Sequence, residues 1–121
     1  MHVANLDQLE PFVTKDGSSI RELAGLVSLP ARQQSLAEAT VPPGGETAEH
    51  FHRVTEEIYL FTRGAGRMRL DGEETQVTAG DMVVIAPGRP HKLWNPGPEP
   101  LVLLCCCAPP YTHDDTVLTG G

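Results

Sequence analysis

Turn-forming residues recur along this chain at short intervals, and that spacing restricts the fold more than any other feature. The 121 residues include 12 glycines and 11 prolines, which are spread along the chain rather than gathered in one tail. Between them lie short runs that alternate like strands, and no long run has the 3.6-residue period of an amphipathic helix. We therefore expect an all-β protein of short strands joined by tight turns.

Eight segments fit strands of ordinary length. Asp71-Gly72 is the clearest hairpin turn between them, because both residues tolerate positive φ. Eight strands at this spacing predict a double-sheet jelly roll or a closed barrel. Residues 20–26 are the one stretch with a helical tendency, and it is short. The expected strands are residues 34–41, 49–52, 57–62, 66–70, 74–77, 82–85, 91–95 and 101–107.

The segments suggest one domain over residues 1–121, with a barrel core at about 34–108. Residues 1–33 are less regular and either lie along the barrel or pair with a second subunit. Their apolar side chains can cover an exposed strand edge, so we expect a homodimer. The tail, 109–121, begins with two prolines that stop the last strand.

Charge restricts the partners of this chain. It carries 9 basic and 16 acidic residues, for a net charge of −7. An acidic surface repels phosphate backbones and anionic lipid, so we expect neither nucleic acid nor a membrane as partner, but a small molecule. Residues 1–12 lack an apolar run long enough for a signal peptide, which predicts a cytoplasmic location.

Three cysteines stand in a row at Cys105, Cys106 and Cys107. Neighbouring residues of a strand point to opposite faces, so the three cannot converge on one metal ion. An odd count in a row is no disulfide framework. We expect them to pack as small apolar side chains in a buried strand, and a redox or catalytic role is the alternative.

Three histidines and a glutamate have the spacing of a metal site. His50 and His52 are two residues apart, so on a strand both imidazoles share one face. Glu57 is at an odd offset, so residues 53–55 must turn and Glu57 must come from the next strand. His91 follows a Pro-Gly-Arg-Pro turn that can start another strand. Imidazole and carboxylate together suit transition metals better than calcium.

Two stretches resemble the two motifs of the cupin superfamily. Residues 44–64 are similar to the first motif and residues 80–95 to the second. One departure is Ala86, where the family usually has proline, although Pro87 follows it. Only 15 residues separate the two motifs, as in the compact microbial cupins. The positions that fit are Gly44, His50, His52, Glu57, Gly64, Gly80, Gly88, His91 and Asn95.

This resemblance implies a double-stranded β-helix, the jelly-roll cupin barrel. It also implies that His50, His52, Glu57 and His91 bind one divalent metal ion per chain. Iron, manganese, nickel, copper and zinc all remain open as the ion. The resemblance itself identifies no residue as a catalytic acid or base.

Strand alternation predicts the walls of the pocket. Tyr59 and Phe61 share the face of Glu57, and Leu93 shares the face of His91. Core packing is the alternative role for the two aromatic residues.

Two further residues are candidates for the pocket. On the strand at 34–41, either the alanines at 37 and 39 or Glu38 and Thr40 face inward, so Glu38 is a candidate general base. His113, in the tail, is a candidate contact at the mouth of the barrel.

These features predict an enzyme that acts at the ion on a small oxygen-donor molecule. Four protein ligands on an octahedral ion leave two positions for substrate and for water or dioxygen. A carboxylate, enol, diketone or phenol would bind there, and the reaction can be that of a dioxygenase, decarboxylase, isomerase or cyclase. The alternative is a non-catalytic module that binds or senses a small carboxylate or sugar.

Overall fold

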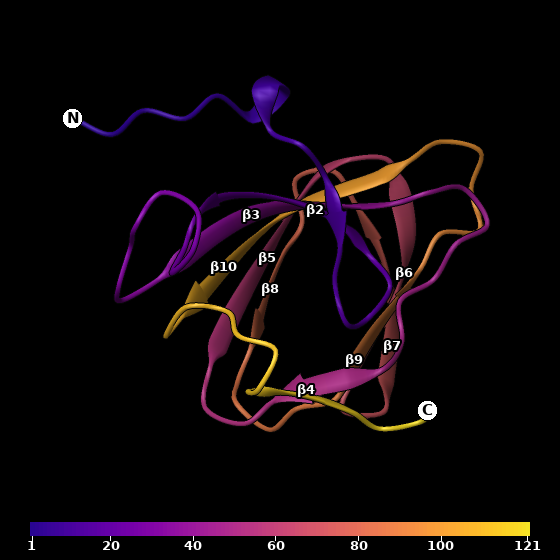
Figure 1. Ribbon diagram of the computed structural model, residues 1–121. Coiled ribbons are helices and arrows are strands. Elements are labelled where there is room, and N and C mark those ends of the chain that lie inside the picture. The colour runs from indigo at the N-terminus through magenta and orange to yellow at the C-terminus, as the bar shows by residue number, and fades with distance from the viewer.

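The computed structural model describes residues 1–121, and its regular structure is nearly all strand (Figure 1). Two antiparallel sheets face each other and enclose the interior. The six-stranded sheet has the order β1 (Phe12–Val13), β2 (Ser19–Ala24), β3 (Ser35–Val41), β10 (Leu101–Ala108), β5 (Glu56–Arg63) and β8 (Met82–Ile85). The five-stranded sheet has the order β11 (Thr116–Leu118), β4 (His50–His52), β9 (His91–Trp94), β6 (Ala65–Leu70) and β7 (Glu73–Thr78).

The expectation of an all-β double-stranded β-helix is confirmed. Each of the eight expected strands overlaps one of β3 to β10. The one helical element is η1 (Leu6–Gln8), a single turn that precedes β1. No helix has the length and apolar character needed to cross a membrane.

The N-terminal residues differ from the expectation at one place. Residues 20–26 do not lean toward helix, because Ser19–Ala24 form β2. Ile20 lies opposite Ala39 and Glu22 opposite Ala37, so β3 supplies the backbone partners that a helix would have found locally. Tertiary pairing therefore overrides a weak local preference here. The same pairing shows that β1 and β2 extend a sheet of their own barrel.

Two turns need the backbone freedom that their residues provide. Asp71 and Gly72 have φ of 51° and 84° and join β6 to β7, as the sequence predicted. Gly64 has φ of 79°, and a Cβ there would lie 2.3 Å from the carbonyl oxygen of Pro100. Glycine is therefore required where β5 passes into β6.

Apolar side chains fill one end of the interior. Leu101 and Leu103 on β10 are fully buried, and Phe61 on β5 is 1% exposed. Each such side chain contributes about 1.5–3 kcal/mol to folding through its removal from water. Toward the other end, the same strands carry Glu57 and Cys107 in place of apolar residues. Polar groups therefore gather at that end.

Candidate metal centre

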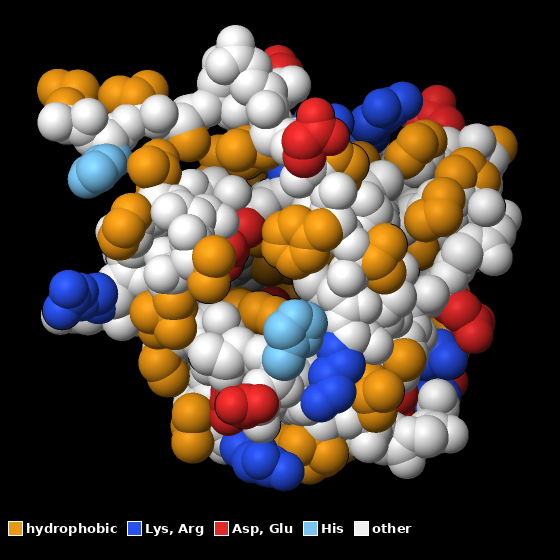
Figure 2. All heavy atoms as spheres, viewed as in Figure 1, with side chains coloured by type: hydrophobic (Ala, Val, Ile, Leu, Met, Phe, Trp, Pro, Cys, Tyr) orange, Lys and Arg blue, Asp and Glu red, His pale blue; other side chains and the backbone are white.

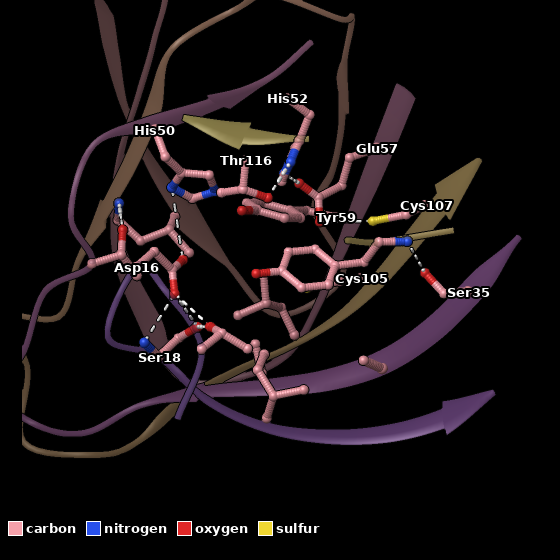
Figure 3. A pocket seen from close by; sticks show the side chains of 18 of the residues that line it. Asp16, Ser18, Ser35, His50, His52, Glu57, Tyr59, Cys105, Cys107 and Thr116 are labelled. Carbon is pink, nitrogen blue, oxygen red and sulfur yellow. Dashed lines mark hydrogen bonds and ion pairs between the residues drawn. The ribbon is translucent and has the colours of Figure 1, made fainter. Parts of the chain in front are cut away.

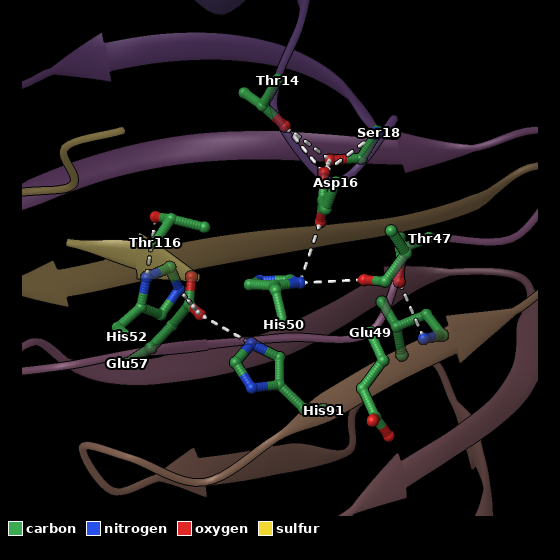
Figure 4. Close-up of polar contacts among 12 residues, drawn as sticks. Thr14, Asp16, Ser18, Thr47, Glu49, His50, His52, Glu57, His91 and Thr116 are labelled. Carbon is green, nitrogen blue, oxygen red and sulfur yellow. Dashed lines mark hydrogen bonds and ion pairs between the residues drawn. The ribbon is translucent and has the colours of Figure 1, made fainter. Parts of the chain in front are cut away.

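Three strands bring the four predicted side chains together. His50 and His52 come from β4, Glu57 from β5 and His91 from β9. One ligand atom from each lies within 4.8 Å of all the others, and all four residues are buried. His50 lies opposite His91 in the β4–β9 pairing, which places their rings side by side (Figure 4).

The chain reverses between His52 and Glu57, as the odd offset required. A carboxylate from the C-terminal segment stabilises this turn. Asp115 accepts hydrogen bonds from the backbone N–H of Val54 at 2.9 Å and of Thr55 at 3.1 Å. These bonds lower the pKa of Asp115 further than its burial raises it. The turn that aims Glu57 inward is therefore held by residues far away in sequence.

Two of the histidines are oriented by backbone carbonyls. The Nδ1 atom of His50 lies 3.0 Å from the oxygen of Ala48, and that of His91 lies 2.9 Å from the oxygen of Arg89. A carbonyl only accepts, so each Nδ1 must carry the proton. The lone pair is then on Nε2, which is the arrangement of a metal-ligating imidazole.

The third histidine is oriented by a threonine. The Nδ1 atom of His52 lies 3.1 Å from the hydroxyl oxygen of Thr116 on β11. That hydroxyl donates its own proton to the carbonyl of Thr112 at 2.9 Å, so it accepts from His52. The Nε2 atom of His52 therefore also has a free lone pair, 3.2 Å from Oε1 of Glu57.

Glu57 is buried yet ionised. Burial raises its pKa, but any proton that His52 or His91 carries at Nε2 in the metal-free chain lowers it more, and the result is well below its usual range. A cation bound at these Nε2 atoms would take the place of such protons. Oε1 faces the histidines, and Oε2 accepts a hydrogen bond from the thiol of Cys107 at 3.2 Å. Buried carboxylates of this kind are found where a cation balances them.

Two observations fit these residues to a divalent ion. Nε2 of His91 is buried without a hydrogen-bond partner, and such groups are rare unless something else satisfies them. Burial lowers the pKa of His50, and a proton on the neighbouring His91 would lower it further, so His50 favours the neutral form that binds metals. Three nitrogens and one oxygen suit a first-row transition metal.

A cavity opens beside the cluster, and Figure 2 shows it as a hollow with apolar side chains inside. Tyr59 and Leu93 line it, as alternation predicted. Phe61 does not line it and is packed in the apolar core, which was the alternative for that residue.

The other two predicted pocket residues lie outside the cavity. Ala37 and Ala39 line the wall, so Glu38 is on the opposite face of β3 and cannot act as a base inside. His113 is exposed, and its Nδ1 lies 3.3 Å from the hydroxyl of Tyr111. It is Tyr111 that reaches the wall of the cavity.

Residues from both ends of the chain complete the wall, and the sequence reasoning missed them. Asp16 and Ser18 come from the turn between β1 and β2, and Thr116 comes from β11 (Figure 3). Nothing in the motif spacing points to them. The one available signal was the Asp-Gly-Ser turn, which has the composition of a hairpin loop.

The cysteines divide between the two faces of β10. Cys105 and Cys107 line the cavity, whereas Cys106 points to the outer face. Burial raises the pKa of Cys105 and Cys107, and the charge of Glu57 raises both further, so both stay protonated. The thiols pack in a largely buried strand as expected, and Cys107 in addition donates to Glu57.

This fold matches that of known proteins. The chain belongs to the Cupin_2 family, described as a cupin domain, whose model matches residues 37–107. An uncharacterised protein of Methanocaldococcus jannaschii is 49% identical over 110 residues, which cover 91% of this chain and 88% of that protein.

Two solved structures are similar in fold. A predicted oxalate decarboxylase from Thermotoga maritima has a TM-score of 0.77 and 22% identity, over 88% of this chain and 98% of the other. A Streptomyces protein, PAC13, solved with uridine, has a TM-score of 0.80 and 16% identity, over 98% and 91%. The same protein is described elsewhere as a nucleoside dehydratase.

Proposed function

We propose that this chain is a metal-dependent cupin enzyme acting on a small organic molecule that presents an oxygen donor. The donor is a carboxylate, enol, diketone or phenol, and the reaction is that of a dioxygenase, decarboxylase, isomerase or cyclase. The observation that carries the proposal is the convergence of three Nε2 lone pairs and one carboxylate oxygen within 4.8 Å beside a cavity.

His50, His52, Glu57 and His91 would hold one divalent ion, which is iron, manganese, nickel, copper or zinc. When bound, such an ion supplies Lewis-acid polarisation of an oxygen donor and, for a redox-active metal, electron transfer. Glu57 lowers the net positive charge of the site by one, and the three neutral imidazoles leave it unchanged.

The cavity wall binds and shields the molecule. Burial raises the pKa of Tyr59 well above its usual value, so its hydroxyl keeps its proton at neutral pH and can donate. Leu93 and Ala37 add apolar surface that excludes water.

A non-catalytic binding module is the second candidate, because cupin barrels host both kinds of function. The enzyme is favoured by the descriptions of the two similar structures, a predicted oxalate decarboxylase and a nucleoside dehydratase. Product formation from a panel of small carboxylates and phenols separates the two: a module binds without turnover.

The deciding experiment measures metal per subunit by atomic emission on protein purified without chelator. His52→Ala is expected to lose most of its metal and keep a strand-type circular dichroism spectrum, because ladder hydrogen bonds and packing hold the strands. His113→Ala is the matched control, since His113 is exposed and outside the cluster, and it should keep full occupancy. Full occupancy in His52→Ala would overturn the site assignment.

We also propose a homodimer, with the outer face of the six-stranded sheet as its interface. Two apolar rows cross that face in register. One consists of Leu36, Cys106, Ile58 and Val84, and the other of Leu104, Leu60 and Met82. Contiguous exposed apolar rows of this kind mark association surfaces, and a second copy presents the same rows in return.

The dimer is tested by light scattering coupled to size exclusion. Ile58→Glu should shift the mass to that of the 13.1 kDa monomer. Val27→Glu is the matched control, because Val27 is exposed and lies outside both rows. A wild-type chain that is monomeric at high concentration would rule the dimer out.

A cytoplasmic location is the remaining part of the proposal. All three cysteines are free thiols, and free thiols persist in reducing compartments.

A further inference from the structure

The charged side chains that line the cavity are all acidic. They are Asp16, Glu22 and Glu57, and no lysine or arginine is among the lining residues. Anionic ligands normally meet arginine or lysine in a binding site. The cavity therefore offers an anion no positive charge other than the ion of the proposed metal centre.

Asp16 is held in one orientation. Its Oδ1 atom accepts three hydrogen bonds, from the hydroxyl of Thr14 at 2.8 Å and from the N–H and hydroxyl of Ser18 at 3.0 Å and 2.6 Å. Only 12% of the Asp16 side chain is exposed. Its rotamer is therefore set before any ligand arrives.

The second oxygen of Asp16 accepts no hydrogen bond from the protein, although it lies within ion-pair distance of His50. Oδ2 faces His50, but it lies 3.8 Å from Nδ1, which is longer than a hydrogen bond, and Nδ1 already donates to Ala48 (Figure 4). The backbone reinforces this position, because the N–H of Ala48 donates to the carbonyl of Asp16 at 2.7 Å. A fixed, unpartnered acceptor thus borders the cavity next to a predicted metal ligand.

The neighbouring cations are turned away from the cavity. The ammonium of Lys15 donates to the carbonyls of His113 and Thr116, at 3.3 Å and 2.7 Å. The guanidinium of Arg21 reaches the carbonyl of Leu6 at 3.4 Å. Neither is placed to neutralise Asp16 or to hold an anion inside.

We propose that Asp16 is a specificity-determining residue that selects ligands with a hydrogen-bond donor, a hydroxyl or an amine, at the end away from the metal centre, and rejects dicarboxylates. The inference rests on the proposed function, since the other end of the ligand binds the ion. The substrate is then a hydroxylated or amine-bearing molecule with one oxygen donor group. Oxalate-like diacids are excluded by like-charge repulsion with Asp16.

Oxalate and oxamate test this, because they are nearly isosteric and oxamate replaces one carboxylate by an amide that donates. Calorimetry measures both dissociation constants on Ni²⁺-loaded protein and on Ni²⁺–nitrilotriacetate in solution. The ratio of the oxalate dissociation constant to the oxamate dissociation constant should be higher on the protein than on the chelate by roughly tenfold or more. Asp16→Asn should remove that preference and keep the nickel, because the amide oxygen can still accept from Thr14 and Ser18.

Asp7→Asn is the control, because Asp7 is exposed and the charge change is the same. It should leave the preference at the wild-type value. Two results would overturn this inference and leave the proposed function standing. One is nickel-loaded wild-type protein whose preference for oxamate over oxalate equals that of the free chelate. The other is an Asp16→Asn variant that keeps the wild-type preference. Wild-type protein that binds no nickel overturns the proposed function and this inference with it. The comparison with the chelate needs no variant, so it decides even if Asp16→Asn does not fold.

Discussion

The two ends of the barrel interior differ in chemistry although the same strands build both. At the packed end, β5 contributes Phe61 and β10 contributes Leu101, both at most 1% exposed, and Leu103 lies where the packed end meets the cavity. At the cavity end, the same two strands contribute Glu57 and Cys107. On the inward face of β5, Phe61 packs in the core and Glu57, four residues away, borders the site. On β10 the same change occurs over the six residues from Leu101 to Cys107.

The difference between the ends explains how a buried polar cluster is tolerated. Removing four polar groups from water is costly unless each is hydrogen-bonded. The packed end supplies the apolar burial, and hydrogen bonds from outside the cluster satisfy the Nδ1 atoms. We therefore expect changes at the packed end to affect stability, and changes at the cavity end to affect binding.

Phe61→Ala should produce the largest effect. It removes a ring from the packed end, where the surrounding strands cannot collapse to fill the space, and should lower the free energy of unfolding by about 3–5 kcal/mol. Urea denaturation followed by fluorescence or circular dichroism measures this. The folded fraction should keep its metal. A loss below about 1 kcal/mol would mean that the two ends do not divide as described.

Glu57→Gln should produce the next largest effect, and it should act on metal binding. The amide oxygen can still coordinate, but the negative charge is lost, so metal affinity should fall by about tenfold, less than in His52→Ala. A competition titration against a chelator gives the affinities of both variants. Equal losses in the two variants would contradict this order and show that the charge of Glu57 matters as much as one nitrogen donor.

The stability of the metal-free protein should depend on pH, and this effect should be smaller than those of the two substitutions above. The pKa of His50 is below its ordinary value of 6.5 in the folded chain, so the unfolded chain takes up that proton first. Stability should therefore decline as pH falls below 6.5. The pKa of Glu57 is also lowered, from 4.5, so its contribution is present above that pH and is lost as pH falls further.

Melting temperature measured in the presence of a chelator, across about pH 8 to pH 5, checks the first of these windows. His50→Gln should flatten the decline. An equally steep decline in that variant would assign the effect to other groups.

Cys107→Ala should have the smallest effect. It removes the donor to Oε2 of Glu57, worth about 1 kcal/mol, so metal affinity should fall by a few fold. Cys107→Ser restores a hydrogen-bond donor to Glu57 and should recover the wild-type metal affinity. Cys106→Ala, on the outer face, should leave metal content unchanged. If Cys106→Ala loses metal and stays folded, the cysteines have a role other than the one described.

The strands were predictable from local pattern, and the cluster from ligand spacing together with the resemblance to the two cupin motifs. Expected strand 82–85 coincides with β8, Met82–Ile85, since turn residues border it on both sides. The odd offset between His52 and Glu57 required the turn that the structure contains. Alternation alone left β3 undecided between alanines and Glu38, and only pairing with β2 and β10 settles which face is inside.

The remaining parts depend on contacts that no local pattern contains. β2 is a strand because β3 is beside it, and its own sequence is ambiguous. Asp16 and Thr116 reach the site from segments distant in sequence from the ligands they approach. Their roles follow from where the chain returns in space, which composition and periodicity do not specify.

The bond between His52 and Thr116 has a consequence for the order of events during synthesis. Translation proceeds from the N-terminus, so all four predicted ligands leave the ribosome before Thr116 on β11 does. Until then, His52 has no hydroxyl at Nδ1, and either ring nitrogen can carry its proton. The nascent chain therefore contains all four predicted metal ligands before Thr116 fixes His52 in the tautomer that leaves its Nε2 lone pair free.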